Sequence, residues 1–150
     1  MSPAAIANFM TPAVHTIGHD RTVDEAYELM RKHRIHHLPV LDGGKLVGLV
    51  SHRDLALVEG LDDLDTSTVR VEEAMSADVF SVADDAPVGE VAHRMAHERF
   101  GSAIVQRGKE IVGIFTTTDA LRALDFLLSS PGVLQALPAA MQPAPSSPVS

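Results

Sequence analysis

The chain has 150 residues, no cysteine, and 20 acidic against 12 basic side chains, which gives a formal net charge of −8. The lack of cysteine excludes disulfides, thiolate zinc sites and a cysteine nucleophile, and the negative charge disfavours binding to nucleic acid. A hydrophobic content of 45% supports a packed core, while no apolar run is long enough to cross a bilayer. We therefore expect a globular, cytoplasmic protein with no nucleic acid and no membrane as a partner.

The sequence repeats itself when it is shifted by 65 residues. Residues 9–55 align with residues 74–120 without a gap, and 12 of these 47 pairs are identical. The most similar stretches are GLVSHRDL, which starts at Gly48, and GIFTTTDA, which starts at Gly113. Two copies are too few for a solenoid, which needs about three repeats to bury its faces. The pattern therefore predicts a closed pair of similar units.

The first copy contains the hydrophobic periods of both helices and strands. It predicts, in chain order, a short helix, a strand, an amphipathic helix, a hairpin and a second helix over residues 4–9, 14–17, 23–30, 37–50 and 54–58. Thr22 and Glu25 form a capping-box pattern at the start of the amphipathic helix. Pro39 lies within a predicted strand, so we expect either an edge position or an interrupted hydrogen-bond ladder there.

The second copy predicts the same elements in the same order. They fall on residues 72–75, 79–82, 88–95, 102–115 and 119–128. Pro87 suits the first turn of its amphipathic helix. Each unit would leave one apolar face of its sheet uncovered, which the other unit can bury. The expected organisation is a repeat over 4–58, an acidic linker over 59–71, a second repeat over 72–128 and a partly disordered tail over 129–150 that is rich in Pro, Ala and Ser.

The order of short motifs in the two copies resembles one known family. MTPAVHTI, HLPV and GLVSHRD follow one another in the first copy, and AMSADVFSV and GIFTTTD take the matching places in the second. This order is similar to that of a tandem pair of cystathionine-β-synthase (CBS) domains, an arrangement called a Bateman module, here free-standing. The resemblance covers residues 4–128. It implies a mixed α+β fold in which two pseudo-symmetric β-α-β-β-α CBS repeats pack into one module.

The resemblance also implies a regulatory, non-catalytic function. Members of the family often bind adenosine-containing ligands such as AMP, ADP, ATP or S-adenosylmethionine in the clefts between two repeats. We therefore expect an adenosine nucleotide as a regulatory ligand in one or both clefts, a role such as energy sensing, a homodimer formed through helices, and an unidentified regulated protein as partner. No cofactor is required. The alternatives are a ligand-free dimerisation or scaffold protein with the same fold and a metal-assisted enzyme that uses histidines.

The matching positions give each site residue an expected role. Asp54 and Asp119 each lie at a strand-to-helix junction, where the resemblance implies that they bind ribose; alternatively, they only cap the helices that follow. The residues expected near phosphate or other polar groups are Ser51, Thr116, Thr118, Thr16, Ser81, Arg53, His36 and His37. The residues expected along the adenine edge are Leu38, Pro39, Ser102, Ala103 and Ile104.

The histidines and hydroxyls do not form a convincing catalytic or metal pattern. His93 and His97 lie four residues apart on a predicted helix, but the glutamate of an HExxH motif is absent, and a solvated face explains them. Ser51, His52 and Asp54 are too close in sequence to form a triad, because neighbouring residues at a strand end project in divergent directions. The sequence therefore predicts no metal site and no catalytic residue.

Overall fold

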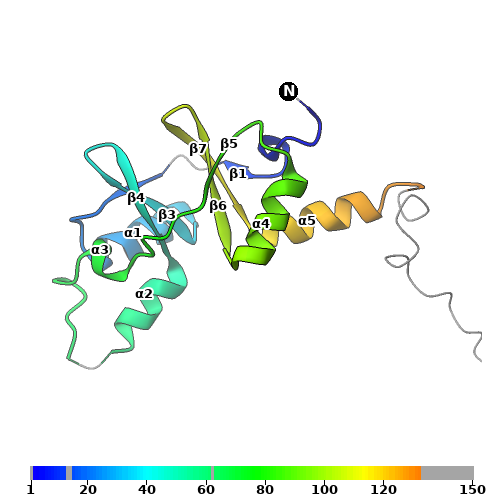
Figure 1. Ribbon diagram of the computed structural model, residues 1–150. Coiled ribbons are helices and arrows are strands. Elements are labelled where there is room, and N and C mark those ends of the chain that lie inside the picture. Colours follow the sequence, from blue (N-terminus) through cyan, green and yellow to red (C-terminus); the bar gives the residue numbers. More distant parts are fainter. Residues whose placement is uncertain (1, 13–14, 62, 133–150) are drawn as a thin grey trace, which may run out of the picture.

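The computed structural model describes residues 2–12, 15–61 and 63–132 and consists of two lobes, each a small sheet with its helices (Figure 1). The first lobe contains, in chain order, β2 (Ile17–Gly18), α1 (Val23–His33), β3 (His37–Asp42), β4 (Lys45–Ser51), α2 (His52–Glu59) and α3 (Val71–Ala74). The second lobe contains η1 (Ile6–Asn8), β1 (Thr11–Pro12), β5 (Ser81–Ala83), α4 (Val88–Glu98), β6 (Ser102–Arg107), β7 (Glu110–Thr116) and α5 (Thr117–Leu128). The predicted mixed α+β fold of two similar units is confirmed.

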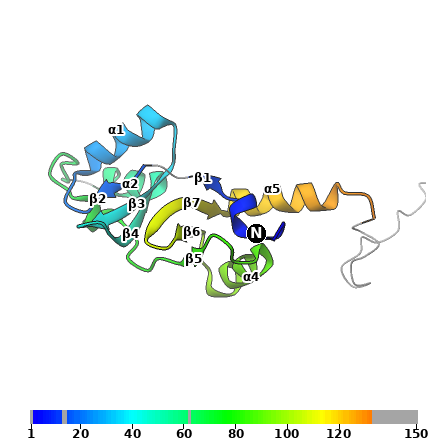
Figure 2. The same ribbon diagram turned by 90° about the horizontal axis from the view of Figure 1, so that it is seen from above.

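The two sheets have the same internal connectivity. Their strand orders are β2-β3-β4 and β1-β7-β6-β5. The parallel pairs β2–β3 and β5–β6 are each joined by an amphipathic helix, as a parallel connection requires, whereas β3–β4 and β6–β7 are antiparallel hairpins. Gly43 and Gly108 lie in the hairpin turns with φ angles of 56° and 62°, a region that glycine enters without strain. Seen from above, α5 extends away from the sheets (Figure 2).

The start of α1 shows why the sequence forms a helix there. The Thr22 hydroxyl accepts a hydrogen bond from the Glu25 N–H at 3.2 Å, and the Glu25 carboxylate accepts one from the Thr22 N–H at 3.3 Å. This is the predicted capping box, which satisfies backbone donors that the helix leaves free. The apolar face of α1 then packs into the core of the first lobe, where Met30 is buried.

Pro39 shortens one of the two parallel ladders. In the second lobe, the Ile104 N–H donates to the Phe80 carbonyl at 2.8 Å, and β5 pairs with β6 over three residues. Pro39 holds the equivalent position in the first lobe and has no N–H to donate. There β2 pairs with β3 over only two residues, beginning at Ile17. The interrupted ladder predicted for Pro39 is confirmed, and the strand expected over 14–17 begins later. Val14, like residues 133–150 of the predicted tail, lies outside the described residues.

Each lobe completes its core with a short helix that precedes the other lobe in the chain (Figure 1). Ile6 of η1 is fully buried in the second lobe, and its N–H donates to the Ala86 carbonyl at 2.7 Å. Val71 of α3 is fully buried in the first lobe, and its N–H donates to the Arg21 carbonyl at 2.7 Å. The two lobes are therefore linked by reciprocal exchange of these helices.

The sheet edges repeat this exchange. Thr11 of β1 pairs with β7 of the second lobe, and Ser76, its equivalent after the 65-residue shift, forms a bridge with Leu49 of β4. The adjacent Met10 and Met75 side chains lie so close to Gly113 and Gly48 that a Cβ atom at either glycine would collide with the methionine sulfur. Among the described residues, no helix combines the length and apolar character needed to span a membrane.

Candidate ligand clefts between the lobes

Two of the clefts between the lobes contain the repeated aspartates, and the 65-residue shift relates their linings. Cleft 1 has a volume of about 700 Å³ and contains Asp54, whereas cleft 2 has a volume of about 520 Å³ and contains Asp119. Residues 98–102 line cleft 1, and the equivalent residues 33–37 line cleft 2. Both volumes lie within the usual range of small-molecule sites, which is roughly 300–1,000 Å³.

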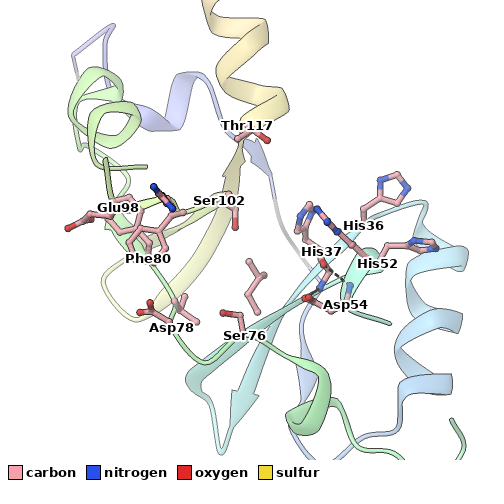
Figure 3. A pocket seen from close by; sticks show the side chains of 17 residues that line it. His36, His37, His52, Asp54, Ser76, Asp78, Phe80, Glu98, Ser102 and Thr117 are labelled. Carbon is pink, nitrogen blue, oxygen red and sulfur yellow. Dashed lines mark hydrogen bonds between the residues drawn. The ribbon is translucent and has the colours of Figure 1, made fainter. Parts of the chain in front are cut away.

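Cleft 1 is enclosed by side chains from both lobes. Figure 3 shows His37 and Asp54 of the first lobe across the cleft from Phe80 and Ser102 of the second lobe. Thr117, at the start of α5, lies at one end of the cleft. A molecule held here contacts both lobes at once.

Asp54 caps α2 through one of its two carboxylate oxygens and leaves the other oxygen available. Its Oδ2 atom accepts a hydrogen bond from the Ser51 N–H at 2.9 Å, and its own N–H donates to the Ser51 hydroxyl at 3.1 Å. Within the described residues, Oδ1 has no hydrogen-bond or ion-pair partner. The side chain is only half-buried. Asp54 can therefore cap α2 and still accept a hydrogen bond from a ligand.

Asp119 caps α5 in the same way but is more fully engaged. It is 4% exposed, and its Oδ2 atom accepts hydrogen bonds from the Thr116 N–H at 2.9 Å and the Thr116 hydroxyl at 3.1 Å. Its Oδ1 atom accepts one from the Thr11 hydroxyl at 2.8 Å and lies 3.5 Å from Arg122 Nη1. A ribose hydroxyl would have to compete with Thr11 for this carboxylate.

His37 lies between the two carboxylates and lines both clefts, as does His36. Burial lowers the pKa of His37, and the nearby His36 lowers it further, while Asp54 and Asp119 oppose the shift. Since the net direction is downward from an ordinary value of about 6.5, His37 is mainly neutral at pH 7. It can then both donate and accept a hydrogen bond.

Two phenylalanines form an apolar wall in cleft 1. The rings of Phe80 and Phe100 stack with their centroids 5.1 Å apart, and the Arg94 guanidinium lies 4.5 Å from the centre of the Phe80 ring. Both rings line the cleft and form an apolar wall, in which Phe80 is only 5% exposed and the half-buried Phe100 offers more of its surface to a ligand. The equivalent positions in cleft 2 are His15 and Ile35.

The structure places most of the predicted polar residues in the clefts. Ser51, Arg53, Asp54 and Ser102 line cleft 1. Thr116, Thr118 and Asp119 line cleft 2. His36 and His37 line both. Roles in ligand binding remain predictions for all of them.

Two predicted hydroxyls are not in either cleft. Thr16 lines a separate surface hollow beside α1. Ser81 forms a hydrogen bond with Gln106, and both line a third hollow, which also includes residues 43–47 of the first lobe. The residues just before them, His15 and Phe80, line the clefts instead. Because successive side chains in an extended segment point to opposite faces, the one-residue difference turns Thr16 and Ser81 away from the clefts. The structure thus places Thr16 and Ser81 outside clefts 1 and 2, and a role for them in ligand binding stays a prediction.

Most residues of the expected adenine edge lie inside the sheets, and their role in ligand binding stays a prediction. Leu38, Pro39, Ala103 and Ile104 are fully buried within the two sheets and do not line the clefts. Only Ser102, at the first residue of β6, reaches cleft 1. The first residues of these strands are at the cleft, whereas the following residues continue into the core.

Sequence reasoning missed the hydroxyls that do reach the clefts. Thr11 lines cleft 2, and its equivalent Ser76 lines cleft 1. Each follows directly after one member of the identical pair Met10 and Met75, which anchors the segment on the sheet of the other lobe. A hydroxyl residue that follows this methionine in both copies was the available signal.

No group of three or more metal-binding side chains occurs within the described part of the chain. The rings of His93 and His97 stack on each other at 3.9 Å on the exposed face of α4. The clefts therefore offer carboxylate, hydroxyl, imidazole and aromatic groups for an organic ligand.

The repeats match a known family. The sequence model of the CBS domain matches residues 6–59 and 71–125. The chain belongs to the CBS domain family. Among curated relatives, the A-adding tRNA nucleotidyltransferase of Geobacter sulfurreducens is 30% identical over 118 residues, which cover 77% of this chain and 13% of that enzyme. This CBS pair thus spans only a small part of that larger relative.

Two similar solved structures contain adenosine compounds. A CBS domain pair in complex with 5′-methylthioadenosine and S-adenosyl-L-methionine is 27% identical, has a TM-score of 0.68, and matches 81% of this chain and 96% of its own. CBSX2 in complex with AMP is 25% identical, has a TM-score of 0.67, and matches 82% of this chain and 97% of its own. CBS pairs are generally regulatory modules, and these two relatives bind AMP or S-adenosylmethionine-type ligands.

Proposed function

We propose that this CBS pair is a non-catalytic regulatory module that binds an adenosine-containing nucleotide of the AMP, ADP, ATP or S-adenosylmethionine type in one or both clefts. The observation that supports this most directly is the Asp54 carboxylate, which caps α2 through Oδ2 while Oδ1 remains available in cleft 1. The adenosine ligands of two related CBS pairs support the ligand class.

Cleft 1 supplies a partner for each part of an adenosine ligand. Asp54 can accept hydrogen bonds from ribose hydroxyls, which strengthen when the acceptor is charged. The rings of Phe80 and Phe100 provide the flat apolar wall for adenine. Arg53 and the backbone N–H groups at the start of α2 can hold a phosphate, because a helix N-terminus attracts anions.

The regulatory signal would arise because the ligand contacts both lobes. A ligand shifts a protein between two arrangements only by as much as its affinity for them differs. The exchanged helices η1 and α3 couple the cores of the lobes, so a change in the cleft would alter how these helices pack. We propose a cytoplasmic homodimer, formed through α2 and α5, that transmits this change to a regulated protein.

Thermal unfolding with AMP, ADP, ATP and S-adenosylmethionine tests the proposal. A ligand at about 100 times its Kd stabilises the folded state by ~2.7 kcal/mol, so at least one compound should raise the melting temperature. Asp54→Asn should weaken this effect because the amide carries no charge, and Asp85→Asn, at an exposed position outside the clefts, should preserve it. If no compound in the set stabilises a well-folded protein, the ligand-free scaffold becomes the better explanation.

A further inference from the structure

Cleft 2 differs from cleft 1 in the charges of its lining. Its ionisable residues are six basic side chains and one acidic side chain: His15, His33, Arg34, His36, His37, Arg122 and Asp119. The single acidic group, Asp119, is already engaged by two threonines, as described above. Cleft 1 contains five basic side chains and three carboxylates: His36, His37, His52, Arg53, Arg99, Asp54, Asp78 and Glu98. The chain as a whole carries a net charge of −8, so the basic lining of cleft 2 is a local feature.

We propose that cleft 2 binds a polyphosphate group, such as the di- or triphosphate of a nucleotide, and that this binding is coupled to proton uptake by His15 and His33. The inference rests on the proposed function in treating the cleft as a ligand site, and it names the chemical class that the second cleft selects. Cleft 1, with its aromatic wall and its carboxylates, suits a ligand of lower negative charge.

The His15–His33 pair provides the proton-dependent part of the site. The two rings stack with centroids 3.6 Å apart and an angle of 17° between their planes. His15 precedes β2, and His33 lies in the last turn of α1. Burial lowers the pKa of His33, and the positive charges of His15 and Lys32 lower it further. Two protonated rings repel each other at this distance, so both become charged readily only when an anion lies beside them.

The other charged groups facing this pair come from several elements, and nearly all are basic. They are Lys32 at the end of α1, Arg34 after it, His36 and His37 at the start of β3, and Asp119 and Arg122 on α5. Arg34 and Arg122 are charged at every physiological pH. His33 and His37, whose pKa values burial lowers, gain charge only as the pH falls below the usual range of histidine. A polyphosphate spans several such groups at once, whereas a single carboxylate would satisfy only one or two.

The 65-residue shift shows that the stacked histidine pair and Arg122 belong to cleft 2 only. In cleft 1 the positions of His15 and His33 are taken by Phe80 and Glu98. Arg122 has Leu57 as its equivalent. The fold is shared by both copies, but the substitutions remove a basic residue from cleft 1 at each of these positions. The difference in ligand preference is therefore a property of this sequence rather than of the fold.

Isothermal titration calorimetry with inorganic tripolyphosphate tests the inference without a nucleoside. We expect the wild-type protein to bind this probe at least about tenfold more tightly at about pH 6 than at about pH 8, although the probe itself carries more negative charge at the higher pH. The double variant His15→Gln/His33→Gln should lose most of this pH dependence. Arg122→Gln, which alters a 74% exposed side chain, should weaken binding at both pH values and keep the pH dependence.

A second stacked histidine pair offers a matched control. His93 and His97 stack at 3.9 Å on α4, outside both clefts, so His93→Gln/His97→Gln should bind tripolyphosphate as the wild type does. Equal wild-type affinity at both pH values, or an unchanged pH dependence in His15→Gln/His33→Gln, overturns the inference. If tripolyphosphate binds with the expected pH dependence but no adenosine compound binds, the inference holds and the proposed function fails. If AMP binds in a manner that requires Asp54 but tripolyphosphate does not bind, the proposed function holds and the inference about cleft 2 fails.

Discussion

At the scale of single residues, Asp54 and Asp119 show how one motif can serve two purposes. Both residues occupy the same position of the repeat and both accept a hydrogen bond from a backbone N–H at the start of the next helix. Only Asp119 also binds a residue of the exchanged segment, through the Thr11 hydroxyl. Helix capping and ligand binding are therefore compatible at Asp54, whereas Asp119 has an additional structural role.

The extra contacts predict unequal costs for the two alanine substitutions. Loss of a helix cap costs ~0.5–2 kcal/mol, and each additional hydrogen bond that is lost adds ~0.5–1.5 kcal/mol. Asp119→Ala should therefore lower the free energy of unfolding by more than Asp54→Ala does, since it leaves both Thr11 and Thr116 without their acceptor. Urea denaturation of the two variants measures the difference. Equal losses would show that the contact with Thr11 contributes nothing to stability.

The residues of the clefts also show what the sequence could and could not predict. The junction residues Ser51, Asp54, Thr116 and Asp119 were predictable because each copy places a hydroxyl and an aspartate three positions apart, which fits a capping box. The sequence did not show that Thr16 and Ser81 lie outside clefts 1 and 2, because a motif fixes the segment that approaches the cleft but not which of two alternating faces points inward. The stacked rings of cleft 1 depend on tertiary packing between α4, β6 and the segment before β5, which no local pattern encodes.

At the scale of elements, the repeat predicted the helices and strands but not which core they join. A shift of 65 residues matches η1 with α3 regardless of whether each packs within its own repeat or on the other one. Hydrophobic periodicity identifies the buried face of a helix, but it says nothing of the partner. In the structure, Ile6 of η1 packs in the core of the second lobe, and Val71 of α3 packs in the core of the first lobe.

The exchange predicts that Ile6→Ala and Val71→Ala act on opposite lobes. Both side chains are fully buried, and truncating a buried isoleucine to alanine costs ~2–5 kcal/mol. In native-state hydrogen exchange, Ile6→Ala should raise exchange mainly in β5, α4, β6 and β7, although it lies at the start of the chain. Val71→Ala should raise it mainly in α1, β3 and β4. If Ile6→Ala raised hydrogen exchange mainly in the first lobe, the packing of η1 on the second lobe would be contradicted.

At the scale of the whole molecule, the two most exposed helices carry apolar residues that the lobes do not cover. On α5, Leu121 and Phe126 are 66% and 67% exposed, and Leu57 on α2 is 65% exposed. Leu124, Leu127 and Leu128 add to this surface. Large exposed apolar surfaces usually mark an interaction site. Since α2 and α5 each begin at a cleft carboxylate, a partner bound to these helices would be in direct contact with the elements that hold the ligand.

The exposed apolar surface on α2 and α5 predicts a homodimer that should dissociate when negative charges are introduced into this surface. Sedimentation equilibrium should give twice the 16.0 kDa mass of the chain for the wild type. The variant Leu121→Glu/Phe126→Glu should sediment as a monomer with an unchanged circular dichroism spectrum, because both side chains project from the fold and burying two carboxylates in an interface is costly. Gly89→Glu/Ala96→Glu, which adds the same charge to exposed positions on α4, should remain dimeric. A wild-type protein that stays monomeric at all concentrations would leave α2 and α5 to bind the regulated protein directly, and the same two glutamates would then be expected to abolish that binding.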